Sequence, residues 1–431
     1  MRGFLRRRRI ESIRKGEEGV VILLVAMVLL FIVAAMAALA IDLVTFYTAR
    51  SEAQQAADGG ALAGARALAN SGMTSDAANT ALSDAAKPIA ITVAMQVASH
   101  NNVGGRTLNG GVNCSQEICV SFNDGDASFG TNPRVTVQVN RADLPTFFAR
   151  IWGRNIAAVR ATATAEAYNP SGADALNPPP TRIASTCVKP WVLPNMDPRN
   201  GNPIFDKTTG AIQDATLLGA DPTVFFSANC ESNCSPSPPS PPPSKWQFYA
   251  GDQSSFPAPT QSLPTCNVAL DDYQTSIAGC VQTPISCNGP VILDLNPDSN
   301  RNTHTAHAVN CLTHTLADKG DSIDTASGNP PFQFIGGLDN PVVGAQGANI
   351  LVSDSLVTVP VYDSSAPFLN TSVQVIGFVQ LFLNYDGIKA PPGNGKINTR
   401  VVNLVGCGAN ATGQAVLGNG PSAIPVRLIA Q

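Results

Sequence analysis

Charged residues are scarce in this chain of 431 residues. They make up 13% of the sequence, whereas hydrophobic residues make up 44%. Disordered proteins have the opposite balance, so the composition predicts a folded protein. The formal net charge of -4 and the pI near 5.6 give no general basic surface, and we therefore expect no nucleic-acid partner.

The sequence also lacks the common signatures of catalysis. It has no G-x-S-x-G elbow, no P-loop and no G-x-G-x-x-G turn after an apolar strand. Asp271 and Asp272 are adjacent carboxylates, but sequence neighbours usually point apart, and such pairs are commonly solvated turn charges. We predict no enzymatic activity and no cofactor.

Candidate metal ligands are few. Three of the 4 histidines, His304, His307 and His314, fall in one stretch, but no H-E-x-x-H pattern is present, so surface polarity is the favoured interpretation. The best candidate for a metal site is a stretch beginning at Asp294 that resembles a calcium-binding loop. It lacks the Gly that such a loop needs, and Thr305 stands where an EF-hand supplies Glu. An Asp/Asn-rich turn is therefore favoured over a metal site. The alternating oxygen-bearing residues of that stretch are Asp294, Asn296, Asp298 and Asn300.

Residues 20–41 contain no charge, no proline and no glycine. About 22 residues of helix span about 33 Å, which matches a hydrocarbon core of roughly 30 Å. Basic residues precede this run and Asp42 follows it, so the positive-inside rule predicts a single-pass membrane protein with a cytoplasmic N-terminus (residues 1–19) and an exported remainder. The basic residues that set this orientation are Arg6, Arg7, Arg8, Arg9, Arg14 and Lys15.

Two other interpretations of this segment were weighed. Ala38-Leu39-Ala40 resembles the A-x-A site of a cleaved signal peptide, but the apolar run is longer than the usual 7 to 15 residues. The arginine run resembles a nucleic-acid patch, but beside a membrane helix it is better explained as an orientation signal and a contact with anionic lipids. We predict a retained anchor in the bacterial inner membrane.

Cysteine placement agrees with export. All 10 cysteines follow the apolar run, and an even number on an oxidising side of the membrane indicates disulfides. Zinc is the alternative, but the sequence has no paired C-x-x-C motif. The spacing does not fix which cysteines pair. They are Cys114, Cys119, Cys187, Cys230, Cys234, Cys266, Cys280, Cys287, Cys311 and Cys407.

The helix is expected to continue past the membrane to about Ala69. Small and apolar residues recur there with a period close to 3.6, which gives one thin apolar face. Periodicity alone does not separate a face that covers this chain's own core from one that docks beside a partner helix. We predict a docking role for Asp42, which closes the membrane helix, and for Phe46, Tyr47, Arg50, Gln54 and Gly64.

The basic start, the helix ending in AALAID and the stretch YTARSEAQQAADGGALAGARAL resemble the N-terminal segment of TadG-like proteins of the Flp (tight-adherence, Tad) pilus assembly system. A weaker similarity to the TadE/TadG group continues over residues 134–167, where two strands are expected to flank a short helix. The resemblance implies an inner-membrane accessory component whose partners are other pilus-assembly membrane proteins.

Pilin processing is not expected. A prepilin peptidase cuts after Gly and usually requires Glu five residues later, whereas Val21 follows Gly16 and Leu24 follows Gly19 at that distance. Some TadG relatives carry an inserted von Willebrand factor A domain with a D-x-S-x-S metal motif. Asp354 and Asp363 do not fit that spacing, so no such domain is predicted.

Proline and glycine divide the exported part. Residues 42–169 are predicted to be the helix extension and a small, pilin-like α+β domain of the TadE/TadG type, with helical stretches on either side of Pro88. A Pro/Gly linker at 170–182 precedes a β-rich domain at 183–431, which contains a polyproline spacer at 235–244. The predicted fold class is therefore α+β with a long N-terminal transmembrane helix.

Three functions from different classes fit this organisation. We favour a non-enzymatic scaffold of Flp pilus assembly with a large periplasmic domain. The alternative is a membrane-anchored adhesin or binding module for an outer-membrane or extracellular ligand, and an envelope hydrolase is less favoured.

Overall fold

A computed structural model provides the fold. Side chains of the first helix are described from residue 19 onward. The described residues are 4–110, 114, 116–149, 153, 156–171, 181–226, 245–260, 270–295, 298, 300–315, 317–324, 329–365, 371–391, 395–408, 412–417 and 422–429.

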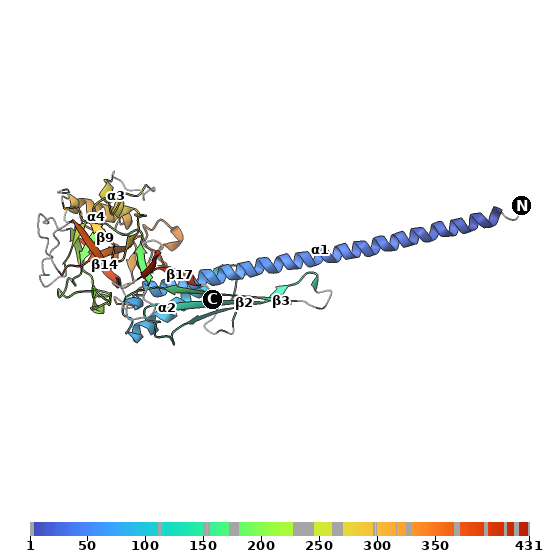
Figure 1. Cartoon of the computed structure of the whole chain (residues 1–431), viewed down its shortest axis with the longest axis horizontal. Helices are drawn as coiled ribbons and strands as arrows, with labels where there is room; N and C mark the ends of the chain where they lie inside the picture. Colours follow the sequence, from blue (N-terminus) through green and yellow to red (C-terminus); the bar gives the residue numbers. More distant parts are fainter. Residues whose placement is uncertain are drawn as a thin grey trace. The chain divides into compact units, whose positions relative to one another are not determined.

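Helix α1 (Phe4–Asn70) is one continuous helix of 67 residues (Figure 1). It contains the entire apolar run and continues past it, as the sequence predicts. Gly59 and Gly60 lie inside it without interrupting it. The weak helix propensity of glycine is offset because α1 packs closely against the rest of the chain there: Gly60 is buried, as are Ala57 and Ala61.

Helix α2 (Thr80–His100) is also continuous, although Pro88 lies inside it. The sequence predicted two helical stretches here, because proline removes one backbone hydrogen bond from a helix interior. Ala90, Ala94 and Ala98 are fully buried and, at a spacing of four residues, lie on one face of α2. Burial of that face explains why the helix persists through the proline.

A four-stranded sheet accompanies these helices, with strand order β1-β2-β3-β17. The last strand of the chain pairs antiparallel with β3, so that Val426 lies opposite Ala167. The short helix predicted between β2 and β3 falls on residues that lie largely outside the described ranges. The strands are β1 (Ile118–Phe122), β2 (Arg134–Pro145), β3 (Ile156–Ala167) and β17 (Val426–Ile429).

The largest sheet closes on itself. Its strand order is β13-β5-β7-β6-β15-β14-β9, and β13 also pairs with β14, so all of these strands except β9 form a ring. Most neighbours are antiparallel, but β5 with β13 and β6 with β7 are parallel. The strands are β5 (Trp191–Pro194), β6 (Thr223–Phe226), β7 (Lys245–Ala250), β9 (Pro290–Ile292), β13 (Leu356–Tyr362), β14 (Ser372–Leu383) and β15 (Ile397–Gly406).

Large side chains make up the core of this barrel. Trp191, Trp246 and Phe248 are at most 1% exposed and belong to one apolar cluster with Val359 and Leu381. A small barrel is normally filled by such inward-pointing side chains, so this barrel is a packed core.

Short elements surround the barrel. They include the 3-10 turns Met73–Ser75, Ala215–Leu217 and Val343–Ala345. Two small sheets have the orders β10-β11-β12 and β16-β4-β8. The remaining elements are α3 (Asp272–Ala278), α4 (Arg301–Leu312), β4 (Thr181–Ser185), β8 (Ile285–Ser286), β10 (Ser322–Ile323), β11 (Phe334–Ile335), β12 (Asn349–Ile350) and β16 (Thr412–Leu417).

The predicted fold class is confirmed: a long apolar N-terminal helix precedes mixed helix and strand content and a β-rich C-terminal region. By internal contacts the chain forms two compact units, and neither is continuous in sequence. The predicted linker at 170–182 lies largely outside the described residues, and so does the polyproline spacer at 235–244. The predicted domain boundaries stay predictions. Unit 1 comprises residues 1–59, 95–119 and 137–163, and unit 2 comprises 60–94, 120–136 and 164–431.

Disulfides are present, as predicted from cysteine placement. Cys114 pairs with Cys119, Cys187 with Cys280, and Cys287 with Cys407. Cys311 is also disulfide-bonded, whereas Cys230, Cys234 and Cys266 lie outside the described residues. No described cysteine is free.

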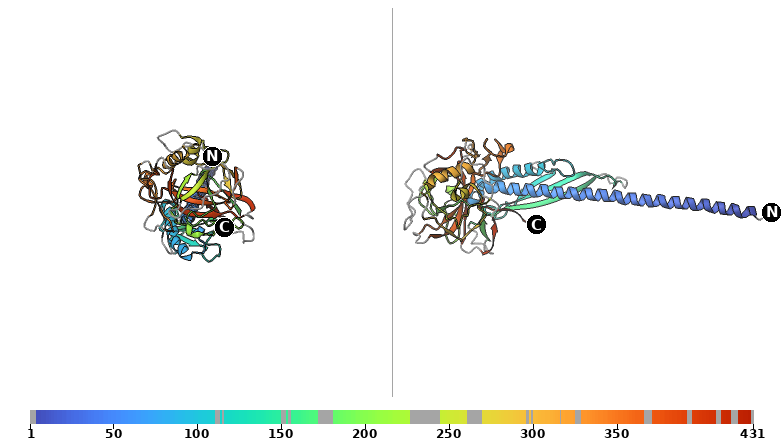
Figure 2. Two further views of the ribbon diagram at one scale, coloured as in Figure 1. Left: turned by 90° about the vertical axis from the view of Figure 1, so that its left-hand side faces the viewer. Right: turned by 90° about the horizontal axis from the view of Figure 1, so that it is seen from above.

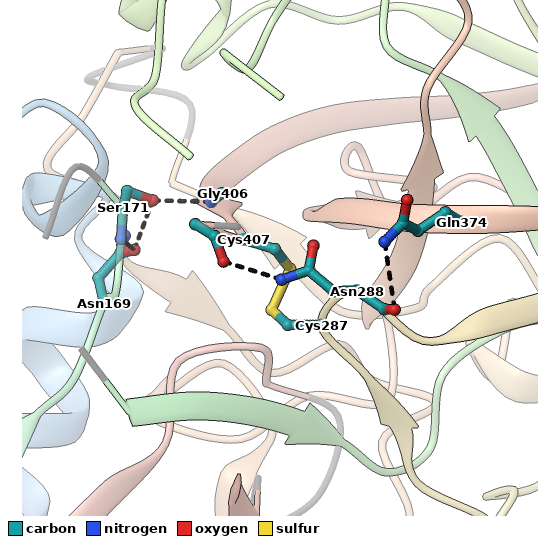
Figure 3. Close-up of a disulfide and its surroundings, with 8 residues drawn as sticks. Asn169, Ser171, Cys287, Asn288, Gln374, Gly406 and Cys407 are labelled. Atoms are coloured by element: carbon teal, nitrogen blue, oxygen red, sulfur yellow. Dashed lines mark hydrogen bonds between the residues drawn. A yellow bond between two sulfur atoms is a disulfide. The ribbon is translucent and has the colours of Figure 1, made fainter. Parts of the chain in front are cut away.

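The Cys287–Cys407 bridge joins the segment between β8 and β9 to the end of β15 (Figure 3). Next to it, the Asn288 side chain donates to the carbonyl of Gly408 at 2.8 Å. On the other side, the backbone N–H of Gly406 donates to Ser171 Oγ at 2.7 Å. The bridge therefore fixes a strand end that is also held by hydrogen bonds.

Candidate functional site

The apolar run of α1 is exposed along its length. Phe31 is 75% exposed and Leu30 is 71% exposed, so this surface requires an apolar environment. Among the described residues, one helix is long and apolar enough to cross a membrane, and it is this one. The side chains of the six orientation residues (Arg6, Arg7, Arg8, Arg9, Arg14 and Lys15) lie outside the described part of the helix.

Asp42 is the only charged residue between Gly19 and Ala49, and it is 3% exposed. Its carboxylate accepts hydrogen bonds from the backbone N–H groups of Phe147, Phe148 and Ala149, at 2.9, 3.1 and 2.8 Å. Burial opposes ionisation, but the three N–H donors outweigh it and lower the pKa of Asp42. The residue is therefore an ionised anchor point for the chain that follows β2.

The other predicted docking residues differ in exposure. Phe46 is half-buried, whereas Tyr47 is 67% exposed and Arg50 is exposed. Gln54 is exposed, and its side chain donates to Asp58 Oδ1 at 2.8 Å and to the carbonyl of Thr162 at 3.3 Å. Tyr47, Arg50 and Gln54 lie within about two helical turns on one side of α1.

Gly64 lies in a contact within this chain. A Cβ atom there would lie 2.9 Å from Val135 Cγ1, 3.2 Å from Ala94 Cβ and 3.4 Å from the carbonyl oxygen of Ala90. Gly59, earlier on α1, faces Val97 of α2. The small residues of α1 thus allow α2 to approach closely, which is one of the two uses that the periodicity permits. Docking to a partner stays a prediction for the exposed residues.

Sequence reasoning missed the polar contacts that hold the segments beside α1. Glu52 accepts from the backbone N–H of Gly104 at 2.6 Å. Arg106 forms ion pairs with Glu117 and with Asp143, the latter at 2.9 Å, and lowers the pKa of both carboxyls. The sequence signal for the first contact was weak, because Glu52 is one of two acidic residues, with Asp58, in the alanine-rich part of α1.

Two of the four weak calcium candidates, Asp294 and Asp298, have side chains with partners in this chain. Asp294 forms an ion pair with Arg301 at 2.7 Å. Asp298 accepts from the backbone N–H of Asn300 at 3.1 Å, and Asn296 lies outside the described residues. No cluster of three or more His, Cys, Asp or Glu side chains suited to a metal was found among the described residues.

The histidines take part in structural contacts. His304 lies 2.8 Å from Asp271, whose side chain also caps the N-terminus of α3 through the backbone N–H of Gln274. His307 lies 3.2 Å from the Gln274 side chain. His314 lies 3.0 Å from Asp354.

The exposed apolar helix and its anchored continuation define a protein held in a membrane near its N-terminus. Residues 19–67 match the family model "Putative Flp pilus-assembly TadE/G-like". The chain therefore carries a TadE/G-like Flp pilus-assembly domain, which coincides with the apolar helix and its continuation and supports involvement in Flp pilus assembly. No curated protein and no solved structure matched the chain.

Proposed function

We propose that this chain is a non-enzymatic scaffold or accessory component of Flp pilus assembly, held in the bacterial inner membrane by one helix. The observation that carries this proposal is the position of the TadE/G-like match. It covers the apolar run of α1 and the extension that presents Tyr47, Arg50 and Gln54 to solvent. A helix with an exposed side just beyond the bilayer suits lateral contact with other single-pass membrane proteins.

Charge and redox chemistry support a periplasmic location for the bulk of the chain. The six orientation residues precede the apolar run, which favours a cytoplasmic N-terminus. The disulfides follow the run, and disulfides persist on the oxidising side of a membrane.

The ionisable groups with perturbed pKa values support a structural role. Lys189 is buried and donates to the carbonyls of Ile277 and Gly279, at 2.6 and 2.7 Å. Asp42 and Glu117 are held by donors of this chain. Since each of these groups has a protein partner, the proposal assigns none of them a chemical step.

The test is affinity purification of the full chain from native membranes after crosslinking, with its N-terminus determined by mass spectrometry. We expect an intact anchor that co-purifies with pilus-assembly membrane proteins. Tyr47→Ala combined with Arg50→Ala should reduce co-purification by roughly tenfold, because truncation of a buried interface aromatic or Arg commonly costs that much.

Gln55→Ala is the matched control, because Gln55 is exposed on α1 but lies about 140° around the helix from Arg50 and about 100° from Gln54. It should leave co-purification and piliation unchanged. A chain that begins after Ala40, or one that is labelled at the cell surface and purifies alone, would replace the scaffold with the adhesin or binding-module alternative.

A further inference from the structure

The uncharged exposed surface of α1 extends beyond the predicted membrane run. Because Asp42 is buried, the first exposed charge after Gly19 is that of Arg50. Leu43 is 52% exposed and Val44 is 64% exposed, so the apolar surface continues past Asp42. From residue 20 to residue 44 the helix covers about 37 Å, which exceeds a hydrocarbon core of roughly 30 Å.

One face of α1 is covered within this apolar stretch. Ala38 is 4% exposed, whereas its neighbour Leu39 is 63% exposed. Asp42 lies one turn after Ala38 on the same face and is 3% exposed. The covered face therefore begins about 6 Å before Asp42 along the helix axis, inside the predicted membrane run.

The chain that follows β2 lies at the depth of Asp42. Three consecutive N–H groups, from Phe147 to Ala149, lie within 3.1 Å of its carboxylate. An aspartate side chain is short, so these residues cannot lie far from the level of the Asp42 backbone. Figures 1 and 2 show β2 and β3 running along α1 toward its N-terminal half.

The surface at this depth is apolar. Phe147, whose backbone N–H donates to the Asp42 carboxylate, is 61% exposed. The ion pairs of Arg106 with Asp143 lie four residues before Phe147, about 13 Å back along the strand direction. From the Arg106–Asp143 ion pair to Phe147, the exposed side chains along β2 and the residues after it therefore change from charged to apolar toward the level of Asp42.

We propose that Phe147, with Leu43 and Val44 of α1, forms a lipid-contacting surface in the interfacial layer of the bilayer, and that Asp42 holds it at that depth. The occupant is lipid because this surface continues the lipid-facing surface of α1 at the same level. Aromatic and apolar side chains are favoured at this boundary of the membrane. The largely undescribed stretch between Ala149 and Ile156 is not part of the proposed surface.

The test uses the full chain in phosphatidylcholine vesicles, with a photoreactive benzoylphenylalanine placed at one position at a time. Phe147 is the test position, and Phe31, inside the apolar run, is the positive control. Gln55 is the negative control, because it is exposed on α1 about 20 Å beyond Asp42. We expect lipid adducts at Phe147 to exceed those at Gln55 by roughly tenfold and to approach those at Phe31.

Asp42 is a positioning residue in this proposal. Asp42→Ala should lower the lipid-adduct yield at Phe147 several-fold and leave the yield at Phe31 unchanged. Asp42→Asn keeps one oxygen acceptor and should give an intermediate yield. The Phe31 measurement shows that the anchor still enters the bilayer, and the intermediate yield of Asp42→Asn separates positioning by the carboxylate from a loss of the fold.

Three outcomes would overturn the proposal. Equal yields at Phe147 and Gln55 would mean that Phe147 faces water. Crosslinks from Phe147 to a second copy of the chain, in place of lipid, would make this surface a protein interface. An unchanged yield at Phe147 in Asp42→Ala would remove the positioning role of Asp42.

Discussion

Gly64 and Gly59 lie on the same helix, and the structure predicts opposite effects for their substitution. At Gly64 a Cβ atom would lie 2.9 Å from Val135 Cγ1, so Gly64→Val forces a shift in a packed contact. We expect a loss of about 1–3 kcal/mol in the free energy of unfolding. Thermal unfolding of the full chain in detergent micelles measures it.

Gly59 provides the matched control. A Cβ atom there would lie 3.5 Å from Val97 Cγ1, an ordinary contact distance. Gly59→Ala should therefore stabilise the chain by about 0.5–1 kcal/mol, because alanine is the better helix former. If both variants shift the midpoint in the same direction, the two glycines do not have these different environments.

The buried side chain of Lys189 should make the free energy of unfolding depend on pH. Burial lowers the pKa of Lys189 to about 7 from its usual 10.5, although the negative charge of Asp354 opposes the shift. Between these two pH values the unfolded chain binds a proton that the folded chain does not, so the free energy of unfolding should rise with pH. The slope is at most about 1.4 kcal/mol per pH unit.

Urea titrations at pH 7, 8 and 9 measure this slope. Lys189→Met has a similar length and carries no titrating group, so it should remove the rise. A flat profile in the unsubstituted chain, or the same slope in Lys189→Met, would show that the ammonium stays charged against the Ile277 and Gly279 carbonyls.

At the scale of elements, the disulfides should differ in their effect on stability. The Cys287–Cys407 bridge closes a loop with a sequence separation of 120, whereas Cys114–Cys119 spans a separation of 5. The chain entropy that a bridge removes from the unfolded state grows with loop length. Double substitution of Cys287 and Cys407 by Ala should cost about 2–5 kcal/mol, and that of Cys114 and Cys119 about 2 kcal/mol or less.

Chemical unfolding of the two double variants under oxidising conditions compares them. Both Cys287 and Cys407 are at most 2% exposed, so their replacement also leaves unfilled space in the core. Equal losses would mean that loop length does not determine the contribution of these bridges.

Some elements were predictable because their signals are local. The apolar run of α1 and the alternating and apolar residues of β14 each specify their structure within a short stretch. The largely apolar stretch at 348–362 has the pattern of a single strand, but the structure divides it into β12 and β13, separated by a turn. In that turn Ser353 donates to Asp321 at 2.6 Å, a contact 32 residues away in sequence.

At the scale of the whole molecule, the pairing of distant strands could not be predicted from the sequence. Closure of the barrel requires β13 to pair with β14. The parallel pairs, β5 with β13 and β6 with β7, join strands that have no tight turn between them. Likewise, β17 completes the sheet that begins with β1. Hydrophobic pattern indicates that such segments are strands, but their partners depend on packing across the molecule.

The candidate site was predictable only where its residues carry a local signal in the sequence. Asp42 was conspicuous because it is the only charge in a long uncharged stretch, whereas its partners, Phe147 to Ala149, carry no signal because they contribute backbone N–H groups. Gly64 was predicted as a docking residue, and the sequence did not identify α2 and Val135 as its neighbours within the chain.

The separation between Asp42 and its partners also orders events during synthesis. The three N–H donors are encoded 105 to 107 residues after the carboxylate they bind. The apolar helix is therefore translated while Asp42 still lacks them, so the carboxylate must remain hydrated or protonated until that later stretch has been made. Closure of these hydrogen bonds then supplies the donors without which burial of the carboxylate would be costly.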